Sequence, residues 1–188
     1  MKIIQIINYF TRLSGNKINK LKLIKLIYFT DKYHLRKYGR TATNDEYWAM
    51  KRGPVQSVTK DLIDGTDFLS PKELEYRKSY IMKEGNTIAS LCDVNEDYLS
   101  DSEISAMDFI WEQYGKLTHG QLIDKSHENI EWKKYEDRLN AGSAREKMNI
   151  IDFFSDSNDE LSKSTANGLD ESKAIFEENE AIKSLLRI

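Results

Sequence analysis

The chain has 188 residues, of which 39% are hydrophobic, and it carries a formal net charge of −3. This is enough apolar material for one compact domain with a short appendage, and the sequence contains neither a signal-peptide core nor a run of about 18 apolar residues, the length that a membrane span needs. Its single cysteine, Cys92, excludes an internal disulfide framework and a zinc site built from cysteines. We therefore expect a soluble, cytoplasmic protein that does not enter a membrane.

Charge is distributed unevenly along the chain. Residues 1–60 contain 13 lysines and arginines against 3 aspartates and glutamates, whereas residues 61–188 contain 15 against 28. Two interpretations are open: an acidic partner binds the first third, or two oppositely charged parts of one domain face each other.

The first two elements are expected to be helices. Residues 2–13 carry large apolar side chains at spacings of three and four, as in an amphipathic helix. Asn19 is expected to cap a second helix, residues 20–38, which ends at Gly39. This second helix is apolar over much of its circumference, which predicts that the rest of the domain packs around it.

The same helix carries a basic stripe, defined here as Lys22, Lys25, Lys32 and Arg36, on the side opposite its apolar face. The stripe is expected to be exposed, and it is interpreted as a solvated face, a protein contact or a contact with nucleic-acid phosphates. Asp31 lies within the apolar face, where a carboxylate needs partners. Arg40, Lys51 or backbone amides near the following turn are the expected partners, and direct contact with a binding partner is the alternative.

After an irregular or extended stretch at residues 41–50, the Gly53-Pro54 pair breaks the chain. Pro54 is expected to be the first residue of a helix that runs to about residue 64. The buried face of this helix is predicted to consist of Val55, Val58 and Leu62.

Residues 76–91 lose the helical period and predict a small β-hairpin with its turn at Gly85-Asn86. Three residues are expected to share one face of its first strand, namely Tyr76, Tyr80 and Met82.

Two further helices are expected before residue 126. Ser100 and Glu103 have the spacing of a capping box, which predicts the start of an amphipathic helix that ends at Gly115. Thr118 is expected to cap a short helix through residue 125.

The C-terminal part differs in composition. Residues 155–168 contain almost no apolar side chains and are expected to form a linker or a mobile loop. Residues 169–188 predict an acidic amphipathic helix of about five turns. The predicted fold is thus mainly α, a compact helical domain of residues 1–150 around a central buried helix with a small β-hairpin, followed by an appendage of residues 151–188.

Catalytic motifs are missing from the sequence. His34, His119 and His127 are scattered, and no nucleophile, metal-ligand spacing, phosphate-binding loop or dinucleotide fingerprint accompanies them. We expect no enzyme activity and no bound metal or cofactor.

A family resemblance rests on two segments of the chain, residues 22–40 and 45–55. Their motif residues are Asp31, His34, Tyr38, Gly39, Arg40, Asp45, Tyr47, Met50, Gly53, Pro54 and Val55, and the later motif residues are His127, which follows Ser126, and Trp132. This pattern resembles the SocA-like antitoxin family, or Panacea domain, which includes phage-associated GepA-like proteins. The resemblance is dense over residues 20–64, thinner to Trp132, and does not reach the tail beyond residue 150.

The resemblance implies an antitoxin of a toxin-antitoxin system, of prophage type, that neutralises a cognate protein toxin by direct binding. Some members resemble adaptors that deliver a toxin to a protease. The toxin-binding candidates are Lys22, Lys25, Phe29, Lys32, Arg36 and Trp48. A nucleic-acid-binding regulator that uses the basic stripe is an alternative, disfavoured by the acidic net charge and the lack of a standard DNA-binding module. The acidic C-terminal helix is the competing candidate to cover the stripe.

Overall fold

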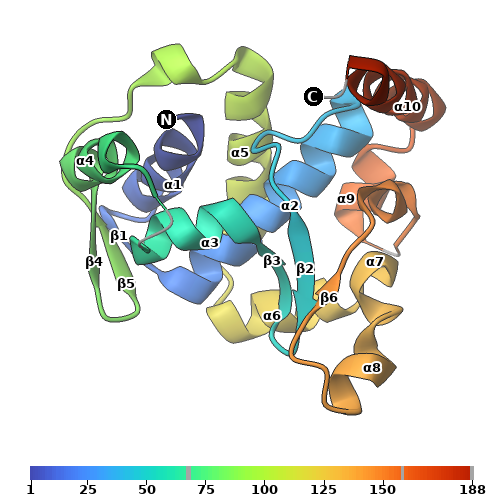
Figure 1. Cartoon of the computed structure of the whole chain (residues 1–188), viewed down its shortest axis with the longest axis horizontal. Helices are drawn as coiled ribbons and strands as arrows, with labels where there is room; N and C mark the ends of the chain where they lie inside the picture. Colours follow the sequence, from blue (N-terminus) through green and yellow to red (C-terminus); the bar gives the residue numbers. More distant parts are fainter. Residues whose placement is uncertain (67–68, 158, 187–188) are drawn as a thin grey trace.

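The computed structural model describes residues 1–66, 69–157 and 159–186 of the chain (Figure 1). The α-helices are α1 (Lys2–Leu13), α2 (Lys20–Tyr38), α3 (Ser57–Asp64), α4 (Pro71–Tyr80), α5 (Asp101–Tyr114), α6 (His119–His127), α7 (Ile130–Lys133), α8 (Glu136–Asn140), α9 (Glu160–Ser164) and α10 (Leu169–Leu186). Two 3-10 helices, η1 (Glu96–Tyr98) and η2 (Ile150–Phe154), lie between them. The mainly α fold class is confirmed.

The strands form two small antiparallel sheets. They are β1 (Lys17–Asn19), β2 (Tyr47–Met50), β3 (Gly53–Gln56), β4 (Ile81–Glu84), β5 (Thr87–Ser90) and β6 (Glu146–Lys147). One sheet has the order β1-β5-β4 and the other the order β3-β2-β6. The second sheet therefore joins β6 to a strand that lies about a hundred residues earlier in the chain.

Helix α2 forms the centre of the molecule, as predicted. Every residue from Leu23 to Arg36 is buried, and α1, α5, α6 and the β3-β2-β6 sheet surround the helix (Figure 1). The Asn19 side chain accepts hydrogen bonds from the amides of Leu21 and Lys22, so it caps the helix as expected. Burial on all sides explains why the sequence of α2 is apolar over so much of its circumference.

Gly39 ends α2 and also brings α10 close to it. Its φ of +69° is in the left-handed region that favours glycine. A Cβ atom at this position would lie 2.7 Å from the carbonyl oxygen of Ser172 and 2.8 Å from the Cβ of Ile175. The start of α10 therefore packs directly on the C-terminal end of α2, as Figure 1 shows at the upper right.

Two predicted elements are wrong in type. Tyr76 and Tyr80 belong to helix α4 and not to a strand, although the predicted hairpin is present as β4 and β5. Helix α4 begins at a Ser70/Glu73 capping box that the prediction overlooked. Pro54 lies in strand β3, paired with Ala49, and the helix starts only at Ser57.

The buried face predicted for that helix is also only partly correct. Leu62 is buried, whereas Val55 is half-buried in β3 and the Val58 side chain is 44% exposed.

The expectation of a linker at residues 155–168 is contradicted by the packing. Leu161 and Thr165 are each 1% exposed, and α9 lies within this segment. Phe153, Phe154, Leu161 and Phe176 belong to the same core cluster as α2. Residues beyond 150 thus complete the core, and independent folding of residues 1–150 stays a prediction.

The uneven charge distribution is matched inside the molecule. Cations of the first third pair with later carboxylates, as the second interpretation predicts, in the ion pairs Lys2–Glu103, Lys20–Asp64, Lys32–Glu131, Arg36–Asp156 and Arg40–Glu103.

Candidate functional site

The basic stripe is not a surface. Lys25 is 1% exposed, and Lys32 and Arg36 are fully buried. Only Lys22 is half-exposed; its Nζ donates to the carbonyl oxygen of Gly115. Phe29, another predicted toxin contact, is also buried, at 1% exposure. The prediction of an exposed stripe is therefore wrong, because each buried cation has partners supplied by other elements.

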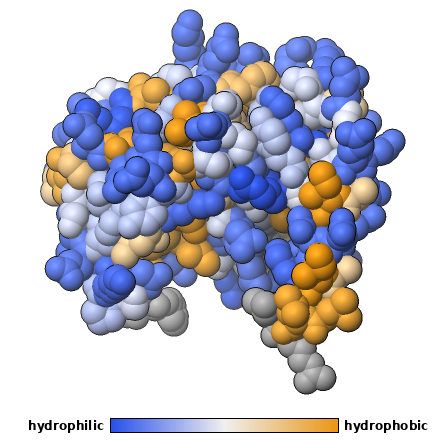
Figure 2. Space-filling view, turned by 90° about the horizontal axis from the view of Figure 1, so that it is seen from above, coloured by the Kyte–Doolittle hydropathy of each residue, from blue (hydrophilic) through white to orange (hydrophobic). Residues whose placement is uncertain are grey.

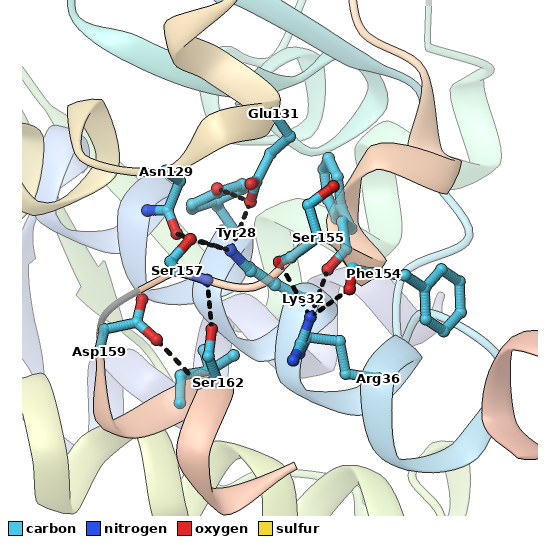
Figure 3. Close-up of polar contacts among 12 residues, drawn as sticks. Tyr28, Lys32, Arg36, Asn129, Glu131, Phe154, Ser155, Ser157, Asp159 and Ser162 are labelled. Carbon is cyan, nitrogen blue, oxygen red and sulfur yellow. Dashed lines mark hydrogen bonds and ion pairs between the residues drawn. The ribbon is translucent and has the colours of Figure 1, made fainter. Parts of the chain in front are cut away.

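Lys32 lies at the centre of a polar network between α2 and the segment that leads into α7 (Figure 3). Its Nζ lies 2.9 Å from Oε1 of Glu131 and 2.6 Å from Oδ1 of Asn129. The Tyr28 hydroxyl donates to the same Glu131 oxygen at 2.5 Å. Ser157 closes the network, since its Oγ donates to Asn129. A buried ammonium needs such compensation, because loss of hydration is costly for an ion.

Arg36 binds the C-terminal part of the chain (Figure 3). Its Nη1 donates to the carbonyl oxygens of Phe154 and Ser155 at 2.7 and 3.0 Å, its Nε donates to Thr165 Oγ1 at 2.8 Å, and its Nη2 pairs with Asp156. The guanidinium thereby satisfies carbonyls at the end of η2, which have no partner within that helix. Arg36 thus helps to hold the η2 end and α9 against α2.

Lys25 connects α2 to the β2-β3 hairpin. Its Nζ donates to the carbonyl oxygen of Pro54 at 2.6 Å, and burial lowers the pKa of this amine well below its usual value. Gly53, with φ of +86°, allows this approach, because a Cβ there would lie 2.7 Å from Lys25 Nζ and 2.3 Å from Ser126 Oγ.

Two late motif residues bind the neighbouring strand of the same hairpin, where Met50 is paired with Gly53. The indole nitrogen of Trp132 donates to the carbonyl oxygen of Met50 at 3.0 Å. The His127 ring stacks on Trp132 at 3.7 Å between centroids. Burial, followed by the nearby Lys25, lowers the pKa of His127. These residues are architectural: they fix the hairpin against α6 and α7.

The acidic motif residues organise the loop after α2. Asp31 is fully buried and accepts hydrogen bonds from the Thr43 amide and hydroxyl at 2.9 and 2.6 Å. A backbone amide is thus a partner as predicted, whereas Arg40 and Lys51 are not. Asp45 accepts from the amides of Val58 and Thr59 at the start of α3.

His34 and Arg40 link this loop to α5. The Nδ1 of His34 donates to the carbonyl oxygen of Arg40 at 2.6 Å, which leaves Nε2 to accept from the Ser102 hydroxyl at 3.0 Å. Burial is the main cause that lowers the pKa of His34 to about 4. Arg40 pairs with Glu103 at 2.8 Å. The imidazole is therefore neutral and structural.

The two motif tyrosines pack against neighbouring rings. Tyr38 lies 4.7 Å from the His34 ring, and Tyr47, 2% exposed, lies 4.8 Å from the Phe153 ring, both between centroids.

The outer face of the β3-β2-β6 sheet carries the one predicted toxin contact in β2. Trp48 is half-buried, and its direct cross-strand neighbours are Val55 and Lys147. The exposed guanidinium of Arg145 lies 4.4 Å from the centroid of the Trp48 ring. We call this set, with Met50, Lys51 and Arg52 at the hairpin end, the Trp48 face.

The Trp48 face is basic. Lys147 pairs with Glu46, but Lys51, Arg52 and Arg145 form no ion pair with any carboxylate of the described residues. Of the Trp48 face, only Trp48 was predicted to contact the toxin. Arg145 carries no motif, and it reaches this face only because the short strand β6, which follows it, pairs with β2.

A cleft of about 920 Å³ lies beside α10. Its walls are the start of α1, residues 39–47, residues 147–150 and the side of α10 that carries Phe176, Asn179 and Ile182. Residues 1–66, 69–157 and 159–186 contain no group of three or more His, Cys, Asp or Glu placed to hold a metal ion. Among the same residues, no helix is long and apolar enough to cross a membrane.

Comparison with known proteins identifies the family. The model of the antitoxin SocA-like, Panacea domain matches residues 23–133, more than half of the chain. The chain belongs to the SocA-like antitoxin family. The matched region of this Panacea domain covers α2 from Leu23 onward, the β2-β3 hairpin and Trp132, and so contains many of the buried contacts described above. No curated protein and no solved structure matches the chain significantly.

Proposed function

We propose that this Panacea-domain protein is the antitoxin of a toxin-antitoxin pair and neutralises its toxin by direct binding through the Trp48 face. Family membership supports the antitoxin role. The observation that carries the choice of surface is the pairing of a half-buried tryptophan with an exposed arginine above its ring. Tryptophan and arginine are enriched among the residues that dominate binding energy at protein interfaces.

Charge favours an acidic toxin surface as the occupant. Arg145 above Trp48, and Lys51 and Arg52 at the hairpin end, have no carboxylate partners in the described part of the chain, so the carboxylates of a partner could pair with them. Such complementarity steers association and fixes orientation, while the aromatic side chain supplies the desolvated centre.

The basic stripe no longer supports nucleic-acid binding. Lys25, Lys32 and Arg36 are buried and bind groups inside the molecule, so they are not presented to phosphates at the surface. Direct protein contact is therefore the better-supported mode.

The test begins with the toxin, a neighbouring reading frame that arrests growth when expressed alone and is harmless when co-expressed with this chain. With that toxin, Trp48→Ala and Arg145→Glu are expected to weaken binding by tenfold to a hundredfold, on the order of 1 to 3 kcal/mol. Growth and the affinity of the purified pair are measured for each variant.

Two matched controls separate the Trp48 face from a general effect. Trp111 is also half-buried beneath a cation, since Lys22 Nζ lies 5.5 Å from its ring, and Lys116 is an exposed cation. Trp111→Ala and Lys116→Glu should leave toxin affinity unchanged in folded protein. Equal loss in the controls, or full protection by folded Trp48→Ala, would refute the assigned surface.

The same cultures distinguish direct neutralisation from delivery to a protease. Under direct binding the amount of toxin, followed by immunoblot, stays constant while growth is restored. A fall in toxin amount that depends on a cellular protease would instead show an adaptor. DNA affinity that disappears in the Arg145→Glu variant, without toxin binding, would assign the face to nucleic acid.

A further inference from the structure

The C-terminal half of α10 extends beyond the core. Phe176 is 9% exposed and lies 5.7 Å from the Phe154 ring, so the first turns of the helix are anchored. From residue 177 to residue 186, however, every residue is exposed. Short helices without tertiary packing are only marginally stable in water, so this half of α10 lacks the contacts that usually stabilise a helix.

Large apolar side chains are exposed along this half of α10 and, at Ile175, just before it. Ile175, Ile182, Leu185 and Leu186 are 48%, 46%, 82% and 62% exposed. Figure 2 shows hydrophobic side chains gathered at the lower right, on the side of the molecule where α10 lies in Figure 1. Exposed apolar clusters of this kind mark contact sites for other proteins.

The apolar residues have coiled-coil spacing. Ile175, Asn179, Ile182 and Leu186 follow one another at intervals of four, three and four, which places them at successive d, a, d and a positions. We call these four residues the α10 seam. Asparagine at a single a position is a known determinant of register in two-stranded coils, because it pairs with its own equivalent.

Charges beside the α10 seam select the partner and its direction. Glu178 and Lys183 occupy the flanking g and e positions, five residues apart. In a parallel pair of identical helices, Glu178 of one copy lies next to Lys183 of the other, whereas an antiparallel pair brings like charges together. Within one copy Lys183 binds Glu180, but both side chains are 47% exposed, so this ion pair is weak and exchangeable.

We propose that the α10 seam is a self-association site, at which two copies of this chain form a parallel two-helix contact. The contact is isologous, since the same residues face each other across a two-fold axis. Asn179 and Ile182 also line the cleft beside α10, so the partner helix would lie at the mouth of that cleft, near the exposed Val58. Packing of Phe176 on the core orders the start of the helix in advance and lowers the entropic cost of association.

The first experiment is sedimentation velocity on the full chain over a dilution series. The parent is expected to dimerise reversibly, and Ile182→Glu to weaken the dimer by at least about tenfold, because it would bury a charge in the seam. Ile130, on α7, is 48% exposed and provides the matched control, so Ile130→Glu should dimerise like the parent. A parent that is monomeric at every concentration, or equal weakening by both variants, overturns the proposal.

The second experiment tests the parallel direction. Glu178→Lys and Lys183→Glu should each weaken the dimer, and the double variant should restore it. In a Cys92→Ser background, Asn179→Cys should form an intermolecular disulfide with its equivalent under mild oxidation, as only the parallel register allows. Failure of the double variant to restore association, together with no disulfide, contradicts the contact. Trp48→Ala should still dimerise, so this proposal stands or falls independently of toxin binding.

Discussion

Lys32 and Glu131 form an ion pair that is closed to solvent: Nζ lies 2.9 Å from Oε1, and both side chains are 0% exposed. Ninety-nine residues separate them in the chain, so this single contact connects the central helix to α7. The second carboxylate oxygen, Oε2, has no hydrogen-bond partner among the described residues, which makes Lys32 especially important for compensating the charge.

Replacing one member of this pair should lower the free energy of unfolding more than replacing both members. Glu131→Leu or Lys32→Met alone should lower the free energy of unfolding by about 3 to 5 kcal/mol, because an uncompensated buried charge remains. The double variant Lys32→Met/Glu131→Leu should lose much less than the sum. Urea denaturation of the four proteins measures the coupling, and strictly additive losses would show that the pair is not an energetic unit.

Arg36→Lys should loosen residues 153–165 although the charge is kept. A lysine ammonium cannot bind the Phe154 carbonyl, Thr165 and Asp156 together as the planar guanidinium does. We expect a loss of about 2 kcal/mol or more and faster proteolytic cleavage within residues 155–168. Arg40→Lys, at a 46% exposed side chain, is the control and should leave the cleavage rate unchanged.

Gly39→Ala should be more damaging than Gly85→Ala. Both glycines have positive φ, at +69° and +60°, so both substitutions incur backbone strain of about 1 kcal/mol. Only at Gly39 would the added methyl group also collide with Ser172 and Ile175, since nothing lies within 4 Å at Gly85. Hydrogen exchange of α10 amides should therefore accelerate in the first variant alone; similar exchange in both would contradict the close packing.

Asp31 should make the fold less stable as pH rises. Burial raises its pKa to about 7, against the opposing effect of the Thr43 hydrogen bonds, whereas the unfolded chain releases this proton near pH 4. Its contribution is therefore complete below about pH 4 and is lost as pH increases to about 7. As the pH rises from about 4 to about 7, the difference in unfolding free energy between the parent and Asp31→Asn should therefore shrink.

A difference that stays constant between these pH values would show that Asp31 ionises normally. Glu103 does not obscure the result, because its pKa is lowered to about 2. Burial alone would raise the pKa of Glu103, but contacts with Lys2, the Ser100 amide and Arg40 lower it. The stability that Glu103 contributes is therefore lost only as the pH falls toward about 2.

Ile27→Ala tests the central position of α2. Ile27 is fully buried, and truncation should lower the free energy of unfolding by about 2 to 5 kcal/mol. A change below about half a kcal/mol in denaturant melts would be incompatible with a central helix.

Local signals predicted much of the helical framework. The cap at Asn19, the end of α2 at Gly39 and the capping box at Ser100 depend on neighbouring residues, and all are confirmed. The prediction failed at Pro54 and Tyr76, where strand pairing and an overlooked capping box, respectively, determine the structure.

The environment of the basic stripe could not be predicted from the helix alone. Periodicity places Lys25, Lys32 and Arg36 on one side, but what lies opposite that side is set by distant segments. Two of these cations bind main-chain carbonyls, at Pro54 and at residues 153–155, and a carbonyl leaves no residue-type signature in the sequence. The two carboxylate partners are Glu131, next to the motif residue Trp132, and Asp156.

The late position of these partners has a consequence for synthesis on the ribosome. When residue 125 leaves the exit tunnel, α2 is complete, but the partners of Lys32 and Arg36 at residues 129–165 have not yet emerged. Closing α2 into a core at that stage would trap two uncompensated cations, so the nascent chain gains little from early collapse. We therefore expect folding to wait until α9 has emerged, so ribosomes stalled before that point should carry a chain that proteases still digest.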